Sequence, residues 1–202
     1  MTTKEELEMV LQIMKKHDLP MSPILEYAIQ EKLDGYTSSN TLSQKSTPIK
    51  ETTNVVTNTL YVDTFKNLST GVQNGKKLPH KAVLLLSVLN LVDDGTIAEN
   101  IIHLNKTIAN SFASTWGNYL QNNKIPSVWI PFWYMKSEPF WHFKALEDEN
   151  ILQNLLCFAG HPSVGQMRSV IKYAYVDEEL FSLMQDRDER SKLKEALIET
   201  YL

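Results

Sequence analysis

The chain has 202 residues, of which 43% are hydrophobic and 22% are charged, and its formal net charge is −4. This is an ordinary globular composition, and one or two domains are expected at this length, with a core that needs no disulfide or metal. The negative net charge argues against non-specific coating of nucleic acid, although a local basic surface is compatible with it.

Two further features of the composition bear on the compartment. The single cysteine excludes an internal disulfide and a four-cysteine zinc site, which favours a reducing, cytoplasmic setting. No apolar run approaches the roughly 20 residues that a membrane span requires, so no membrane contact is expected.

The N-terminal quarter of the chain is predicted to form a small module followed by a linker. Apolar residues at helical spacing, with a stop at Asp34-Gly35, predict a helical pair over residues 1–35. Residues 36–53 are rich in Ser, Thr, Asn and Lys and show no sustained apolar period, which indicates a linker. The main domain is therefore expected to cover residues 54–202.

The first half of the main domain is predicted to be largely helical. A helix over 54–68 leads into a polar loop over 69–75. A helix over 79–92 is apolar on almost every side, which is typical of a helix buried at the centre of a domain. A short strand over 99–104 and a helix over 106–121 are expected to follow.

An aromatic segment then predicts a β-hairpin. Residues 128–135 and 140–144 are β-branched and aromatic, and a polar turn separates them. Pro131 would confine the first strand to an edge, because proline has no N–H for the sheet.

The remaining residues predict four helices, at 148–158, at 163–174, at 177–184 with Asp177 as its cap, and from Asp188 or Ser191 to Leu202. The expected fold class is mainly α with a small antiparallel β-hairpin, an α+β arrangement. The order helix, helix, short strand, helix and hairpin is similar to that of a winged-helix module.

No pattern of residues supports catalysis. The five histidines are scattered, no His-Glu-x-x-His pair or acidic cluster has metal-ligand spacing, and no glycine-rich phosphate loop is present. Cys157 lies in an apolar run and is expected to be a buried small hydrophobe rather than a nucleophile. We therefore predict no catalytic residue, no metal and no cofactor for this chain.

The start of the apolar helix is a candidate anion site. Pro79-His80-Lys81 opens the helix, whose first N–H groups and positive dipole end suit an anion such as a phosphate. Lys77 brings further positive charge beside that end. The alternative is a solvated loop with incidental lysines.

The aromatic segment is a candidate contact surface. Phe132 and Trp133 are expected in the core, as aromatic residues of strands usually are. Alternation cannot bury every ring, so some of Ile130, Pro131 and Tyr134 should reach the surface. An exposed apolar patch of this kind is typical of a binding site.

The order of these motifs resembles a known family. Pro79-His80-Lys81, a leucine-rich helix closed by Asp94-Gly95, a Pro131-Phe132-Trp133 segment and a second Phe140-Trp141 segment are similar to the DNA sulfur-binding domain. That domain precedes the HNH nuclease domain of McrA-like restriction endonucleases and recognises phosphorothioate-modified DNA. The resemblance covers roughly residues 54–202.

The resemblance implies a role for individual residues. His80 and Lys81 would lie against the modified backbone, and Ile130, Pro131 and Tyr134 would form an apolar hollow for the sulfur. Sulfur is larger and less strongly hydrated than the oxygen it replaces, so an apolar hollow can prefer it. The sequence departs from the family where Ile130 replaces a usual aromatic residue and where Tyr134, large enough to fill the hollow, replaces a small one.

The expected function is therefore that of a non-catalytic DNA-recognition domain of a restriction-endonuclease-related protein. The implied partner is double-stranded DNA, with or without a phosphorothioate, and an HNH nuclease is expected in a longer chain or as a separate partner. The alternative is a protein–protein interaction module of a defence or regulatory complex. The DNA reading requires Lys77, His80 and Lys81 to share one surface with the hollow.

Overall fold

The computed structural model describes residues 59–120, 124–157 and 160–202. All of them belong to the second of the chain's two units, Ile49–Leu202. These residues are mostly helical with two small antiparallel sheets, which confirms the predicted mainly α, α+β class. Within the described stretches, no helix combines the length and the apolarity needed to cross a membrane.

The N-terminal predictions fall largely outside the described part of the chain. The helical pair over 1–35 and the linker over 36–53 lie there entirely. Of the helix predicted over 54–68, residues 59–66 are described and are helical, with Tyr61 and Phe65 buried.

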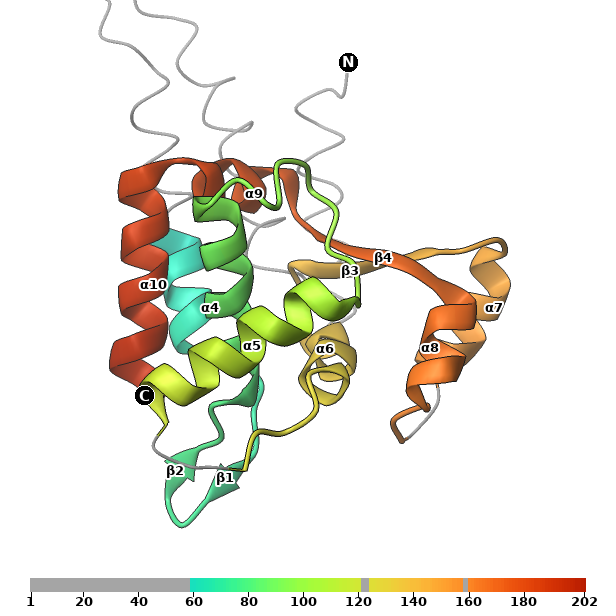
Figure 1. Cartoon of the computed structure of the whole chain (residues 1–202), viewed down its shortest axis with the longest axis horizontal. Coiled ribbons are helices and arrows are strands. Elements are labelled where there is room, and N and C mark those ends of the chain that lie inside the picture. The colour runs from blue at the N-terminus through green and yellow to red at the C-terminus, as the bar shows by residue number, and fades with distance from the viewer. Residues whose placement is uncertain (1–58, 121–123, 158–159) are drawn as a thin grey trace, which may run out of the picture. The chain divides into compact units, whose positions relative to one another are not determined.

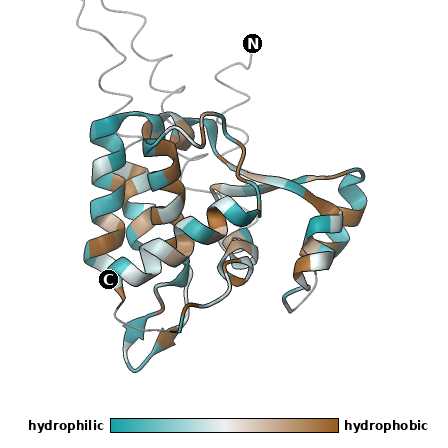
Figure 2. Ribbon diagram, viewed as in Figure 1, coloured by the Kyte–Doolittle hydropathy of each residue, from teal (hydrophilic) through white to brown (hydrophobic). Residues whose placement is uncertain are grey.

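Helix α4 (His80–Asp93) is the centre of the core, as its apolar composition predicts. Figure 1 shows it surrounded by its neighbours, and it contacts α5 (Lys106–Tyr119), α6 (Trp129–Tyr134), α9 (Glu178–Gln185) and α10 (Arg187–Tyr201). Figure 2 shows that α4 is largely hydrophobic, whereas α10 carries hydrophilic residues along much of its length. An all-round apolar helix is therefore covered on every side by amphipathic ones.

A short β-hairpin precedes α4, where the sequence predicts a polar loop. Strands β1 (Val72–Gln73) and β2 (Lys76–Lys77) pair antiparallel across Asn74 and Gly75. Both turn residues have positive φ, 52° and 75°. An Asn-Gly pair is the preferred sequence for such a two-residue turn, so the signal was present in the sequence.

The predicted hairpin over 128–144 is wrong, because its first half is helical. Residues Trp129–Tyr134 form α6, and η2 (Met135–Ser137) continues it as a 3₁₀ turn. Pro131 is the third residue of α6, where an N–H would have no intrahelical partner in any case. The order of elements consequently departs from that of a winged helix after α5.

The second half of the predicted hairpin is a strand, but its partner lies elsewhere. Strand β3 (Trp141–Ala145) pairs antiparallel with β4 (Ile171–Val176). The helix predicted over 163–174 ends earlier, as α8 (Val164–Val170), and β4 follows it directly. The β-branched and aromatic residues of β4 favour a strand over a helix.

The two strands lead from the core to a pair of helices (Figure 1). Helix α7 (Glu149–Leu156) follows β3, and α8 precedes β4, so the four elements form a continuous arm. The strand predicted over 99–104 is reduced to one bridge, in which Ile102 pairs with Ala174 of β4. This bridge attaches the base of the arm to the segment before α5.

Asp177 does not cap α9, although it stands at the cap position. Its carboxylate instead binds the His142 ring at 2.7 Å and accepts a hydrogen bond from the Tyr61 hydroxyl at 3.0 Å. Burial, and then the nearby Asp177 charge, raise the pKa of Tyr61. The side chain thereby joins the helix at 59–66, β3 and α9. The last helix is capped by Asp186 rather than by the predicted Asp188 or Ser191.

Trp133 is the largest fully buried side chain and anchors α6 to the arm. Its ring stacks on Phe143 of β3 with centroids 6.1 Å apart, and its indole N–H donates to the Gly160 carbonyl at 3.0 Å. The ammonium of Lys136, a residue of η2, lies 4.3 Å from the centroid of the Trp133 ring. Three parts of the chain therefore meet at this one side chain.

We predict that Trp133→Ala lowers the free energy of unfolding by about 3–5 kcal/mol, because it leaves a large cavity in a packed core. Chemical denaturation followed by circular dichroism measures the change. Ile151→Ala is the control, since its side chain is 52% exposed and a surface truncation costs about 0.5 kcal/mol or less. A Trp133 variant no less stable than the Ile151 variant would contradict this account of the core.

Candidate functional site

Five of the six residues predicted to contact DNA line one cavity. The cavity has a volume of about 520 Å³ and is open to solvent between the start of α4, the face of α6 and the loop before β1. We call it the proline cavity, and it is lined by Ser69, Thr70, Gly71, Leu78, His80, Lys81, Ile130, Pro131, Tyr134 and Ser137. The two predicted groups, at the helix start and around the proline, therefore share one surface.

The helical form of α6 explains the apolar wall. Residues at i and i+4 of a helix lie on the same face, so Ile130 and Tyr134 are neighbours, with Pro131 beside them. The next residues, Phe132 and Trp133, turn into the core and are fully buried. Tyr134 remains 40% exposed and lines the cavity without filling it.

A buried ion pair lies at the inner end of the cavity. Lys81 is only 6% exposed, and its ammonium donates to the Ser69 carbonyl at 2.5 Å, to Ser137 Oγ at 2.7 Å and to Glu138 Oε1 at 2.5 Å. An ammonium has three N–H donors, so all of them are used within the protein. Lys81 therefore holds the cavity together, and its charge is already neutralised by Glu138.

The same carboxylate connects all the walls of the proline cavity. Glu138 is 4% exposed, and its Oε1 also accepts the backbone N–H of Ser69 at 3.1 Å. Ser137 donates in turn to the Tyr134 carbonyl at 3.1 Å. The loop at Ser69, the start of α4 at Lys81 and the end of α6 are thus fixed to one another by charge-assisted hydrogen bonds, which are stronger than neutral ones.

His80 forms the rim of the cavity. Its ring lies against the buried Trp116 ring, with centroids 5.1 Å apart. Burial lowers the pKa of His80 below its ordinary value of 6.5, so the ring is neutral at pH 7. No side chain caps α4, so the rim offers a neutral imidazole and the uncapped helix N-terminus rather than a fixed cation.

Lys77 is the predicted residue that does not line the cavity. Its ammonium donates to the Lys66 carbonyl at 2.9 Å and lies 5.2 Å from the centre of the Tyr201 ring. Lys77 is therefore turned toward the helix at 59–66 and α10.

Some residues of the site carry no signal in the sequence. Glu138 and Ser137 follow α6 in a short polar turn, and no local pattern distinguishes them from other turn residues. The structure explains why residue 71 is a glycine, since a Cβ there would lie 3.1 Å from Leu78 Cδ1 and would crowd the cavity wall.

Cys157 was expected to be buried but is exposed, because α7 ends there and the residue caps the helix at the surface.

Comparison with protein-family models and with curated proteins finds no match for this chain. Among the described residues, no group of three His, Cys, Asp or Glu side chains is arranged to hold a metal ion. The candidate site consequently rests on the geometry of its own residues.

We predict that the Lys81–Glu138 pair is strongly coupled. Lys81→Met leaves the Glu138 carboxylate buried without its counter-ion and should cost about 3–5 kcal/mol of unfolding free energy. The double variant Lys81→Met/Glu138→Gln should cost much less than the sum of the two single variants, because neither charge is then left alone. Urea denaturation of the four proteins gives the coupling energy.

Lys144→Met is the matched control for this cycle, because Lys144 forms an exposed ion pair with Glu149. That substitution is expected to leave stability nearly unchanged. Single-variant effects at Lys81 and Glu138 that add within about 0.5 kcal/mol would show that the two side chains act independently.

Proposed function

We propose that residues 59–202 form a DNA-recognition unit that contacts the backbone of duplex DNA at the proline cavity, and that the cavity accepts the sulfur of a phosphorothioate linkage. The observation that carries the proposal is that His80, Lys81, Ile130, Pro131 and Tyr134 line one solvent-open cavity. The resemblance to the sulfur-binding domain pointed to these residues, and their meeting supports that reading. The reading also expected Lys77 beside the cavity, where it does not lie.

The chemistry of the walls suits a sulfur atom. Leu78 and Ile130 are half-buried and offer carbon surface, whereas Pro131 lines the cavity as a buried residue. No Asp or Glu side chain lines the cavity. The Thr70 and Ser137 hydroxyls in the lining already donate to the carbonyls of Leu78 and Tyr134. A non-bridging phosphate oxygen that entered would therefore exchange its hydrating waters for fewer hydrogen bonds, at a cost of about 1–3 kcal/mol. Sulfur is held less tightly by water, so its transfer into the same space costs less.

The surrounding polar groups suit the rest of the phosphate. The neutral His80 ring can donate one hydrogen bond, and the uncapped N-terminus of α4 adds backbone N–H groups and the positive end of the helix dipole. Lys81 acts in this proposal as a positioning residue, because its ammonium is saturated by Ser69, Ser137 and Glu138. The proposal assigns no catalytic step to the chain.

We predict that the protein binds a duplex with a single phosphorothioate at least about fivefold more tightly than the matched unmodified duplex, which corresponds to about 1 kcal/mol of oxygen desolvation. Fluorescence anisotropy at a stated salt concentration measures both affinities. Ile130→Ser should reduce the ratio toward one, because a hydroxyl in the wall can hydrogen-bond to the oxygen.

Tyr134→Ala and Tyr119→Ala form a matched pair for the same assay. Both tyrosines are exposed, at 40% and 43%, but only Tyr134 lines the cavity, so only its variant should change the ratio. If binding depends on salt but shows no preference for the phosphorothioate, the proposed contact with the DNA backbone stands and the proposed recognition of sulfur is rejected. Negligible binding to both duplexes would overturn the proposal and favour the protein-interaction alternative, in which the apolar cavity holds a side chain of a partner protein.

A further inference from the structure

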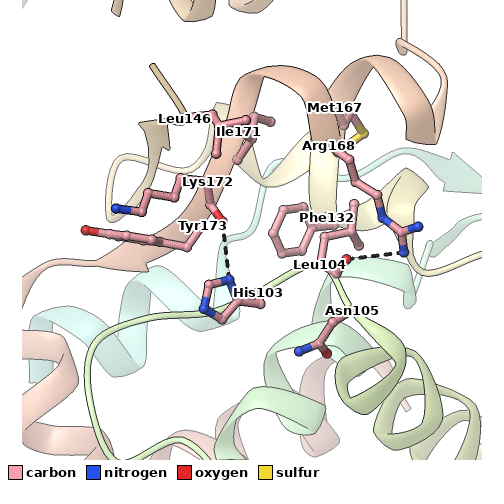
Figure 3. A pocket seen from close by; sticks show the side chains of 10 residues that line it. All are labelled: His103, Leu104, Asn105, Phe132, Leu146, Met167, Arg168, Ile171, Lys172 and Tyr173. Atoms are coloured by element: carbon pink, nitrogen blue, oxygen red, sulfur yellow. Dashed lines mark hydrogen bonds between the residues drawn. The ribbon is translucent and has the colours of Figure 1, made fainter. Parts of the chain in front are cut away.

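A second hollow lies at the base of the arm and is distinct from the proline cavity. It has a volume of about 270 Å³, and Figure 3 shows the side chains around it. The buried Phe132 ring forms its floor, and the Arg168 and Lys172 side chains extend on opposite sides of that ring. His103 and Tyr173 complete the side on which Lys172 lies.

The basic side chains of this hollow are available to a ligand. Arg168 and Lys172 are exposed, and no carboxylate in the described part of the chain forms an ion pair with either. Arg168 uses one terminal nitrogen in a long, 3.4 Å hydrogen bond to the Leu104 carbonyl, which leaves most of its five N–H donors for other partners. His103 donates from Nδ1 to the Lys172 carbonyl at 3.2 Å, so the ring and the strand are held in place.

Two intermediate hollows connect this one with the proline cavity. Leu104, Asn105 and Arg168 line both the arm hollow and the next one, which lies beside the first half of α5. The residues Ile125, Pro126 and Ser127 line that hollow and a third one, beside the end of α5. The third hollow shares Leu78 and His80 with the proline cavity. We call this succession of four hollows the basic band.

The basic band is free of acidic side chains, although the whole chain has more acidic than basic residues. The cations that line it are Lys124, Arg168 and Lys172. His80, His103 and Lys81, whose charge Glu138 neutralises, also line it, and no Asp or Glu does. By contrast, the hollow between the helix at 59–66 and α10 is lined by Glu189, Glu195 and Glu199 together with Lys66 and Lys192. With 24 acidic and 20 basic residues in the chain, this separation produces a locally positive surface on a negatively charged protein.

The length of the band suits a stretch of duplex. Asn105 caps α5 at the arm hollow, and Leu120 follows the helix at the third hollow. Fifteen residues separate them, which at 1.5 Å per residue is about 22 Å. At a rise of about 3.4 Å per base pair, this distance corresponds to six or seven base pairs.

We propose that the basic band is a second contact with the backbone of the same DNA duplex, in which Arg168 and Lys172 hold phosphates several base pairs from the linkage that enters the proline cavity. The inference rests on the proposed function, and it adds the path of the DNA across the protein. These cations contact phosphate oxygens only, so they contribute affinity that does not depend on sulfur.

The test compares the salt dependence of DNA binding in two doubly substituted proteins. Arg168→Gln/Lys172→Gln removes two charges from the band, and Arg187→Gln/Lys192→Gln removes two exposed charges of α10 outside it. Loss of two phosphate contacts should lower the slope of log affinity against log salt by about 1.8. When the salt concentration is raised from 50 to 200 mM, affinity should fall in both proteins, and the fold-loss should be about 12 times smaller in the band variant than in wild type. The α10 variant should behave like wild type.

The preference for phosphorothioate separates this inference from the function on which it rests. In the band variant, affinity for both duplexes should fall while their ratio stays at the wild-type value. A wild-type slope in the band variant would overturn the inference and leave the proline cavity as the DNA site, whereas no DNA binding by the wild type would overturn both. Lys172→Glu provides a second variant, and unchanged affinity in it would likewise overturn the inference.

Discussion

The buried Lys81–Glu138 ion pair is the interaction on which the candidate site depends. Its two side chains come from the start of α4 and the end of the turn after α6, and Glu138 also accepts the backbone N–H of Ser69. Without this pair, the three segments that enclose the proline cavity would have no common anchor. Burying two charges is costly, and it is tolerated here because each finds several hydrogen-bond partners. The arrangement converts a lysine that the sequence presents as a ligand-binding cation into a structural one.

The shape of the cavity follows from the choice between helix and strand at residues 129–134. As a strand, the segment would have placed Pro131 on the opposite side from Ile130, because side chains alternate. As the short helix α6, it presents Ile130 and Tyr134 to the cavity, which the buried Pro131 also lines, and it places Phe132 and Trp133 in the core. The packing of Trp133 against β3 and Gly160 holds this orientation. The core residue and the site residues are thus set by the same turn of helix.

The distribution of charge is as informative as the shape. The neutral rim at His80 and the neutralised Lys81 leave the proline cavity largely apolar, while the cations of the basic band lie farther along the same surface. In the proposed function, this division separates two tasks. The cavity discriminates between atoms by their hydration, and the band supplies the electrostatic attraction that any phosphate backbone feels.

The sequence by itself determined the mainly helical class and the buried position of α4, and the order of its motifs pointed to five of the residues that line the proline cavity. These follow from local signals, because apolar periodicity and motif order are properties of neighbouring residues. Tertiary structure alone decided that residues 129–134 are helical, that β3 pairs with β4 thirty residues later, and that Lys81 forms a buried ion pair with Glu138. Those outcomes depend on contacts between distant segments. A short aromatic run such as residues 129–134 carries too few residues to show a helical or a strand period, so the contacts with the surrounding core decide its conformation.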